Sequence, residues 1–477
     1  RALAGALRVN KGLTTLISKG NSFGDQGFAE LADALRTNNT LRTLIVENRG
    51  IGDEGVQALS DALLTNSTLS TLQITYKGVG QGGVKALAEA LRSNKALSSL
   101  SILHSQIGDA GYEAMADMLR TNSTLCTFEM GGLFDTVTET GLKALAATLR
   151  TNNTLRTLNL LNSPGVCPEG MKALADALQT NNSLETLETR SNHVGDEGAQ
   201  ALGDALRMNT ALLNLRISRT EVRELGMRAL GDALGTNNTL RTLDVSHNRG
   251  GQAGLDAIAN GLRANTGLTA LDIAYVGGSE EVSGPIGEAL RVNNTLATLN
   301  MSTNAVGVEG LKVFGGALRT NTALSCLDMS ITGSKGKDAV ASGLGTNRTL
   351  KALQLGAVDD AGLKALGRAL LRNRGLSSLS FVLTDVTNPE GLILVAEALR
   401  TNRTLRSLEI SLRGDGKVLF IVSLRAFVDA LRNNTTLTTL HPIDFRRGSL
   451  QDPALFDEMQ GLLARNAGIL EAAALVR

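Results

Sequence analysis

Residue types that could carry out chemistry are few in this sequence and lie far apart. No Ser-His-Asp or Cys-His set is visible, because the histidines fall in separate stretches of the chain: His104, His193, His247 and His441. The GxxxxGK[ST] and HExxH patterns do not occur. The best remaining candidates are Asp244 and Asp272, a carboxylate pair that could transfer protons or bind a cation weakly. Nothing in the sequence indicates a closed pocket around them, so we predict no catalytic, cofactor or metal site.

The composition narrows the class of partner. Lys and Arg number 47 and Asp and Glu number 46, which does not favour a nucleic-acid or anionic-membrane partner. Three widely separated cysteines are typical of reduced thiols in a cytoplasmic protein. No apolar run reaches the ~18–20 residues of a membrane span. We therefore expect a cytoplasmic protein with protein partners, no nucleic acid and no membrane span.

The elements that must position any functional residue come from a repeat. The pattern Leu-x-x-Leu-x-apolar occurs sixteen times, mostly 28 residues apart, with units of 26 residues from Leu324 and Leu350. The first residues of the pattern, called anchor leucines below, are Leu13, Leu41, Leu69, Leu97, Leu125, Leu155, Leu184, Leu212, Leu240, Leu268, Leu296, Leu324, Leu350, Leu376, Leu405 and Leu437. The chain begins as if within a helix, RALAGALRVN, so either the first repeat is incomplete or the sequence is part of a longer polypeptide.

Each repeat predicts a strand followed by a helix. After Leu240, TLDVS alternates between apolar and polar residues, which is the period of a strand. In IGDEGVQALSDALL, the apolar residues Val56, Leu59 and Leu63 recur at helical spacing. We expect an aspartate to cap the helix N-terminus in several repeats: Asp25, Asp53, Asp109 and Asp196.

Units such as LETLETRSNHVGDEGAQALGDAL from Leu184 and LRTLDVSHN from Leu240 resemble the leucine-rich repeat family, in its ribonuclease-inhibitor-like class. The resemblance covers nearly the whole chain. It implies an α/β solenoid, a horseshoe of about 16 strand–helix repeats with a parallel sheet on the concave face and helices on the convex face. We expect residues 1–440 to form the solenoid and residues 441–477 to form a C-terminal cap.

An asparagine stands three residues before every anchor leucine, as in the thrice-repeated TNNTLRTL. We interpret this column as framework, with a left-handed backbone at the turn and a side chain that satisfies backbone groups there. Ten of the sixteen also match Asn-x-Ser/Thr, so glycosylation is the alternative if the parent protein is secreted.

A second column places arginine in the last helical turn, often with an acid three residues earlier, as in Asp33 with Arg36. Such pairs face each other on a helix, so we predict a neutralised, solvated face rather than a stripe that binds a polyanion.

The repeat pattern does not fix the residue type at the strand positions that face the concave side, so we expect any binding function there. These positions are polar, with an acidic bias from Glu188 to Asp328, which suggests docking of a basic or polar segment; ordinary solvation of a sheet is the alternative. Tight binding is not favoured, because aromatic anchors are few. The candidate partner-binding residues are Glu188, Arg190, Arg216, Arg219, Asp244, His247, Asp272, Tyr275 and Asp328.

We predict a non-enzymatic protein-interaction scaffold, or the ligand-sensing arm of a larger protein. The TNNTLRTL and IGDEG style resembles the C-terminal repeats of NOD-like receptors. One alternative is a Ran-type GTPase-activating protein, which is similar in repeat type, although the ending ILEAAALVR lacks the acidic tail of that family. Another is a structural bracket in a large assembly.

Overall fold

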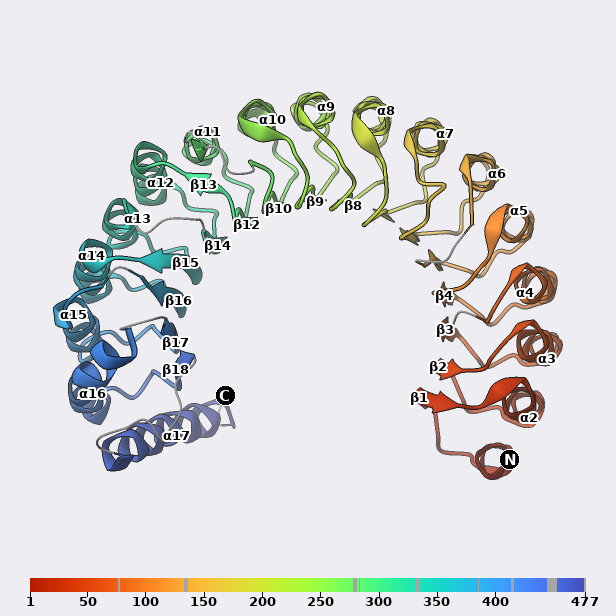
Figure 1. Ribbon diagram of the computed structural model, residues 1–477, viewed down its shortest axis with the longest axis horizontal. Coiled ribbons are helices and arrows are strands. Elements are labelled where there is room, and N and C mark those ends of the chain that lie inside the picture. Colours follow the sequence, from red (N-terminus) through yellow and green to blue (C-terminus); the bar gives the residue numbers. More distant parts are fainter. Residues whose placement is uncertain are drawn as a thin grey trace. The chain divides into compact units, whose positions relative to one another are not determined.

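The computed structural model describes residues 1–75, 78–132, 136–277, 281–282, 284–330, 335–384, 386–412, 416–443 and 453–475. By its internal contacts the chain divides into two compact units, residues 1–248 and residues 249–477. Each unit is built from the predicted strand–helix repeats, with the strands side by side in a parallel sheet (Figure 1).

The first unit has nine strands in chain order within its sheet. They are β1 (Thr15–Ser22), β2 (Thr43–Arg49), β3 (Thr71–Thr75), β4 (Ser99–Leu103), β5 (Thr127–Gly131), β6 (Thr157–Leu161), β7 (Thr186–Glu188), β8 (Asn214–Arg216) and β9 (Thr242–Asp244). The helices are α1 (Ala2–Val9), α2 (Gly24–Thr37), α3 (Asp53–Leu63), α4 (Gln81–Ser93), α5 (Gly108–Leu119), α6 (Glu139–Leu149), α7 (Pro168–Leu178), α8 (Gly195–Met208) and α9 (Glu224–Leu234).

The second unit has the same alternation with more irregular lengths. Its main sheet runs through β10 (Ala270–Asp272), β12 (Thr298–Asn300), β14 (Cys326–Asp328), β15 (Ala352–Val358), β16 (Ser378–Leu383), β17 (Ser407–Leu412) and β18 (Thr439–Ile443). A small separate sheet pairs β11 (Glu281–Val282) with β13 (Ala305–Val306). The helices are α10 (Gly251–Ala264), α11 (Pro285–Leu290), α12 (Val308–Thr320), α13 (Lys337–Leu344), α14 (Asp360–Arg372), α15 (Glu390–Leu399), α16 (Gly416–Asn433) and α17 (Pro453–Leu475).

The register of the sheet places equivalent residues of successive repeats side by side. Leu187 of β7 pairs with Leu215 of β8, which pairs with Leu243 of β9. All three side chains are at most 1% exposed. Burying one leucine contributes about 1.5–3 kcal/mol, so the repeated leucine rows are the main source of cohesion between neighbouring repeats.

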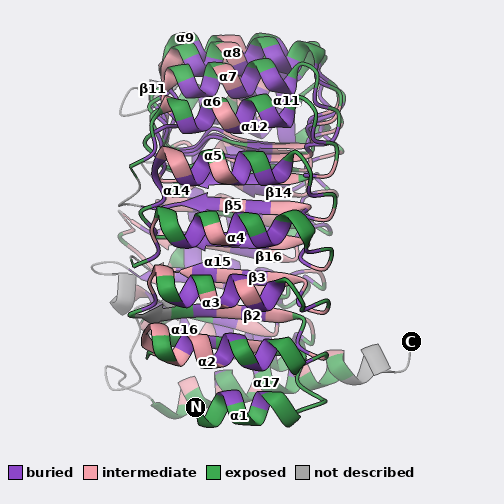
Figure 2. Cartoon of the chain, turned by 90° about the vertical axis from the view of Figure 1, so that its right-hand side faces the viewer, coloured by how far each residue is buried: buried purple, intermediate pink, exposed green. Residues whose placement is uncertain are grey.

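The helices cover one face of each sheet and leave the other face open. In α3 the residues Val56, Leu59 and Leu63 are fully buried against the sheet, which confirms the predicted apolar face. Buried and exposed segments alternate along α3 and α4 in Figure 2, as expected for helices with one side in solvent. A helix is about 10 Å wide and strands lie about 4.8 Å apart, so within each unit the strands occupy the concave side and the helices the convex side (Figure 1).

The last helix, α17, packs against α16. Arg432 of α16 forms an ion pair with Glu458 of α17, with 2.8 Å between Nε and Oε1. Asn466 is fully buried and donates hydrogen bonds to the carbonyl oxygens of Asn434 and Leu437, at 3.0 and 2.8 Å. Residues 444–452 lie outside the described part of the chain.

Candidate protein-binding surface

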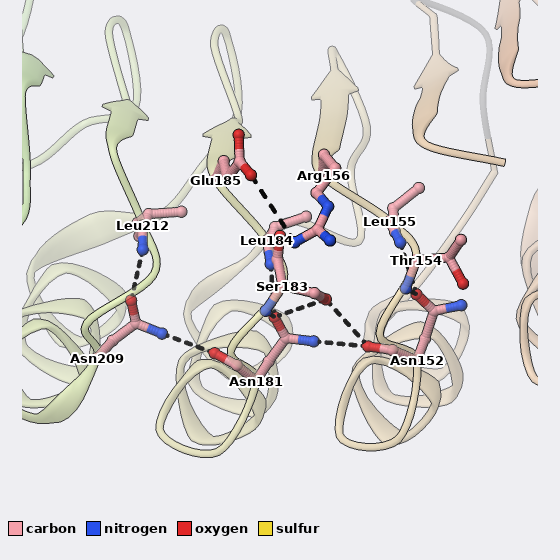
Figure 3. Close-up of polar contacts among 10 residues, drawn as sticks. All are labelled: Asn152, Thr154, Leu155, Arg156, Asn181, Ser183, Leu184, Glu185, Asn209 and Leu212. Atoms are coloured by element: carbon pink, nitrogen blue, oxygen red, sulfur yellow. Dashed lines mark hydrogen bonds and ion pairs between the residues drawn. The ribbon is translucent and has the colours of Figure 1, made fainter. Parts of the chain in front are cut away.

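The asparagine column forms a ladder of hydrogen bonds that joins neighbouring repeats within each unit, as Figure 3 shows for Asn152, Asn181 and Asn209. The Asn181 amide nitrogen donates to the carbonyl oxygens of Leu149 and Asn152, at 2.6 and 3.0 Å. Its Oδ1 accepts from the backbone nitrogens of Ser183 and Leu184, at 3.0 and 2.8 Å. One side chain thus satisfies backbone groups at the end of α6, in the preceding repeat, and in the turn that leads into β7. This confirms the predicted framework role.

The predicted left-handed backbone at these asparagines is wrong. Asn38, for example, has φ −77° and ψ 123°, which is an extended conformation. It is 2% exposed, and its amide nitrogen donates to Leu7 and Asn10 of the preceding repeat. The side chain can reach back only from an extended backbone that points it into the stack. The nitrogen that would carry a sugar is buried and bonded, so the Asn-x-Thr match is incidental in the folded protein.

Left-handed backbone occurs instead seven residues after the anchor leucine, just beyond the end of the strand. The non-glycine residues described with positive φ at this position are His104, Asn162, Ser191, Arg219, His247, Tyr275 and Thr303. An asparagine follows several of them and holds the turn: Asn248 donates to the carbonyl oxygens of Ile217 and Val245 at 2.8 and 2.9 Å, and its Oδ1 accepts from the nitrogen of Thr220 at 3.0 Å. The turn is therefore fixed by the residue next to it, and the left-handed residue can vary.

The predicted aspartate caps act on the neighbouring helix. Asp196 lies inside the first turn of α8, and its Oδ1 accepts from the nitrogens of Arg223 and Gly226 at the start of α9, at 2.8 and 2.9 Å. Asp25 does the same for Gly52 and Gly55. Capping of the aspartate's own helix was the wrong expectation, because the N-termini of successive helices lie side by side and the nearest free N–H groups belong to the next repeat.

The arginine column forms the predicted pairs with the acids three residues earlier. The Nη1 of Arg207 lies 2.6 Å from Oδ1 of Asp204, and the Nε of Arg92 lies 3.1 Å from Oε2 of Glu89. Similar pairs occur in α2, α5, α11 and α16. The convex face is neutralised at these helices, as predicted.

The open face of the first unit carries the cluster that sequence reasoning singled out there. This first-unit cluster consists of Glu188, Arg190, Arg216, Arg219, Asp244 and His247. Glu188 pairs with Arg216 across β7 and β8, and Arg216 with Asp244 across β8 and β9. The strand register thus brings residues of three repeats into one row.

Glu188 is the buried centre of this row. Its side chain is only 7% exposed, and it forms ion pairs with the guanidinium groups of Arg190 and Arg216. Nη1 of Arg216 is 3.7 Å from Oε2 of Glu188, and Arg190 forms the closer ion pair. The two arginines remain about half exposed, at 50% and 46%. The acid of this row thus forms ion pairs with two bases in the first unit, and docking of a basic or polar segment on this surface stays a prediction.

Arg219 and His247 stand at the edge of the same surface. Both occupy the left-handed position and both are exposed. The nitrogen of Arg219 donates to the carbonyl of Ser246 at 3.1 Å, which fixes the backbone beneath the side chain. In the described part of the chain, no carboxylate lies within ion-pair distance of the Arg219 guanidinium. Arg219 therefore offers a cation on a rigid support.

The remaining candidates, Asp272, Tyr275 and Asp328, lie in the second unit and are called the second-unit cluster. Asp272 and Asp328 each accept a hydrogen bond from the backbone nitrogen two residues later, at 3.0 and 2.8 Å, and thereby close the turn after the strand. Asp244 in the first unit does the same with Ser246. At each of these aspartates, one carboxylate oxygen stabilises the turn, so the same side chain serves the framework as well as the proposed surface.

Tyr275 is the aromatic member of the second-unit cluster. It holds a left-handed backbone with φ 54°, and it is 49% exposed. Asp272 belongs to the second unit and Asp244 to the first, so the side-by-side carboxylate pair stays a prediction.

One buried amine was missed by the sequence analysis. Lys337 at the start of α13 is fully buried, and its Nζ donates to the carbonyl oxygens of Leu355 and Ala357 at 2.6 and 2.9 Å. Burial lowers its pKa to about 8, and the nearby charge of Asp359 opposes that shift. The amine satisfies carbonyls where the register of β15 shifts between Gln354 and Ala357. A lone lysine at a helix start gives no sequence signal for this role.

Comparison with protein families agrees with the repeat geometry. A family model described as "Leucine Rich repeat" matches four segments, residues 37–60, 180–203, 236–259 and 292–315. Each segment begins near a ladder asparagine and contains the strand and the start of the helix. The chain is a leucine-rich repeat protein. No protein with a curated description matches its sequence closely.

Among solved structures, this leucine-rich repeat protein is similar to one of the Rad7 and Elc1 complex in yeast, with 16% identity over 81% of this chain and 83% of that chain, and a TM-score of 0.45. It is also similar to actin-binding site 2 of leiomodin-1, with 19% identity over 28% of this chain and 78% of that chain, and a TM-score of 0.26.

Within the described ranges, no three His, Cys, Asp or Glu side chains gather closely enough to hold a metal ion. No helix in the same ranges combines the length and the apolar character needed to cross a bilayer.

Proposed function

We propose that this leucine-rich repeat protein is a non-enzymatic protein-interaction scaffold that binds a partner through the open face of its sheet. The first-unit and second-unit clusters are the proposed contact residues. The observation that carries the proposal is the triplet of Glu188 with Arg190 and Arg216. The Glu188 side chain is only 7% exposed and forms ion pairs with both guanidinium groups, each of which is about half exposed.

Such an arrangement favours recognition because it lowers the entropy lost on binding. Ordering a long side chain at an interface costs about 0.5–1.5 kcal/mol. Arg190 and Arg216 are already ordered by Glu188, and their free N–H groups can meet carboxylates or carbonyls of a partner. Formal charges in the first-unit cluster are +1 with His247 neutral, from three arginines and two acids. We therefore propose an acidic or polar protein segment as the partner of this cluster, in place of the basic one expected from the sequence.

The finer assignment is part of the same proposal. We propose a cytoplasmic protein with no nucleic-acid partner, in which the repeats serve as a scaffold or as the ligand-sensing arm of a larger protein. The small net charge of the chain supports this. A Ran-type GTPase activator and a structural bracket are the alternatives, and the GTP-hydrolysis assay in the Discussion tests the first.

Residues 441–477 are proposed to cap the solenoid formed by residues 1–440. Asn466 supports this, because it bonds to Asn434 and Leu437 much as each ladder asparagine bonds to the repeat before it. Arg465 adds hydrogen bonds to the carbonyl oxygens of Leu431 and Asn434, at 2.9 and 2.7 Å. A helix that ends the ladder in this way closes the hydrogen-bonding groups of the last repeat.

The test is affinity capture from the source organism with wild-type protein, Arg219→Glu and a control, Arg150→Glu. Arg219 is on the open face and Arg150 ends α6 on the convex face; both are exposed arginines. We expect the partner to be retained by wild type and R150E and lost with R219E, with unchanged circular dichroism. Equal capture by R219E, or equal loss with R150E, would remove the open face as the binding surface.

A further inference from the structure

A groove of about 630 Å³ lies on the helical face of the second unit, between α13 and α14. It is separate from the open face of the sheet. Its presence follows from the short repeats that begin at Leu324 and Leu350: α13 has only 8 residues, whereas α12 and α14 have 13 each. The shorter helix leaves space beside α14 that a full-length helix would fill.

The residues lining the groove break the charge pattern of the other repeats. Eight residues before the anchor leucine, ten of the sixteen repeats have Asp or Glu. In α13 this position is Ser342, and in α14 it is Arg368, the only cation in the column. Five residues before the anchor, where arginine is usual, α13 has Gly345 and α14 has Leu371. These four residues all line the groove.

The substitutions have a physical consequence on each wall. The small residues Ser342 and Gly345 remove the acid–arginine pair that would cover this space, so the groove stays open. On the other wall, Arg368 and Arg372 lie one helical turn apart, about 6 Å along the axis. In the described part of the chain, neither has a carboxylate within ion-pair distance. Leu371 stands beside them and is 43% exposed.

The surrounding charge is also positive. Residues 335–375 contain eight Lys and Arg against three Asp, a net charge of +5 in a chain whose total is +1. Lys364 lines the same wall and is partly neutralised by Glu390, with 2.5 Å between Nζ and Oε2. Arg319 approaches from α12 and donates to Ser342 Oγ at 2.9 Å. The apolar residues Ala361, Ala365 and Ala369 of α14 also line the groove.

We infer that this groove binds an acidic, amphipathic helix of a protein partner. Two carboxylates one helical turn apart on that helix would pair with Arg368 and Arg372, and an apolar side chain between them would cover Leu371. An apolar contact flanked by cations fits such a helix better than a nucleic-acid backbone, which presents phosphates without apolar groups.

The experiment measures fluorescence anisotropy of a labelled 14-residue helical peptide with Glu at positions i and i+4 and Leu at i+3. The probes for comparison are the same peptide with Lys in place of Glu and a single-stranded oligonucleotide of equal charge. The protein variant is Arg368→Asp with Leu371→Arg, which restores the acid–arginine pair found in other repeats and should fold. The change at Arg368 lowers the net charge by two and the change at Leu371 raises it by one, so the double variant differs from wild type by −1. The control Arg150→Gln on α6 also changes the net charge by −1.

We expect the acidic peptide to bind wild type and R150Q equally and to bind the double variant at least tenfold more weakly, with no binding of the lysine peptide. Three results would overturn the inference: no binding of the acidic peptide at about 1 mM, equal binding to the double variant, or an oligonucleotide that binds at least as tightly and loses binding in the same variant. The last result would indicate a polyanion site. A loss of helical content in the double variant is checked by circular dichroism, and Arg372→Gln then provides the same binding test with a smaller change.

Discussion

The asparagine ladder should give a large and local loss of stability when one member is removed. In Asn181→Ala the carbonyl oxygen of Leu149 loses its side-chain donor, and the backbone nitrogens of Ser183 and Leu184 lose their acceptor. The carbonyl of Asn152 keeps a hydrogen bond from Ser183 Oγ at 3.1 Å. Three buried groups are therefore left without this partner. Each costs about 1–3 kcal/mol, so the lower limit gives a loss of about 3 kcal/mol.

The assay is amide hydrogen exchange measured by mass spectrometry on peptides covering residues 150–186. Exchange suits a repeat protein because global unfolding of a long array need not be two-state. A loss of about 3 kcal/mol corresponds to roughly a hundredfold faster exchange at Ser183 and Leu184. The matched control is Asn182→Ala, since Asn182 is the exposed neighbour in the same turn.

A second variant separates the two halves of the side chain. Asn181→Asp keeps an oxygen acceptor for the nitrogens of Ser183 and Leu184 but turns the donor to Leu149 and Asn152 into a carboxylate that faces their carbonyl oxygens. We expect it to destabilise the repeat at least as much as alanine does. If N181A exchanges no faster than N182A, the ladder would be a geometric by-product of the repeat and not a source of its stability.

Three further predictions follow from other contacts. Asp196→Ala should lower the free energy of unfolding by about 0.5–2 kcal/mol, because the backbone nitrogen of Gly226 at the start of α9 loses its acceptor. Urea denaturation measures this loss against the exposed control Asp232→Ala. Equal free energies for the two variants would contradict the cross-repeat cap. Partial burial raises the pKa of Asp109, but hydrogen bonds from Thr138 and Gly141 outweigh this effect, so the pKa lies below its ordinary value. The stabilisation from Asp109 is therefore present above the unfolded pKa of about 3.9 and is lost as the pH falls through the folded pKa. Between pH 5 and pH 2 the wild-type protein should lose more stability than Asp109→Asn, and parallel curves of stability against pH would refute this. The protein should not accelerate GTP hydrolysis by a Ran-type GTPase in a phosphate-release assay, and acceleration would replace the scaffold proposal with the GTPase-activator alternative.

The repeat framework could be predicted because the same requirement recurs every 28 residues or so. Leucine rows such as Leu187 and Leu215 are visible in the sequence and are buried as expected. The errors came from rules that look only at neighbours along the chain. Asn38 bonds to a carbonyl 31 residues away, and Asp25 accepts from a nitrogen 27 residues away, so local capping rules assigned both the wrong geometry.

The candidate surface was predictable only in part. Strand alternation placed Glu188 and Asp244 on the open face, but it could not show that Arg190 and Arg216 would cover Glu188, because one of them comes from the next repeat. The left-handed position of Arg219 gave no signal either, since arginine has no preference for it. The turn is held by Thr220, whose hydroxyl donates to the carbonyl of Ile217 at 2.6 Å, and by Asn248 of the next repeat, which accepts from the Thr220 nitrogen at 3.0 Å.

The direction of the asparagine ladder has a consequence for synthesis on the ribosome. From Asn38 to Asn237 in the first unit, and from Asn293 to Asn434 in the second, the amide of each ladder asparagine reaches back to the repeat that precedes it, as Asn209 does to Asn181 and Leu178. Each new repeat therefore finds its bonding partners in chain that has already emerged, and none of these bonds waits for sequence still to be translated. Because chains emerge N-terminus first at about 5–20 residues per second, a repeat of this length can be added to the growing stack every few seconds.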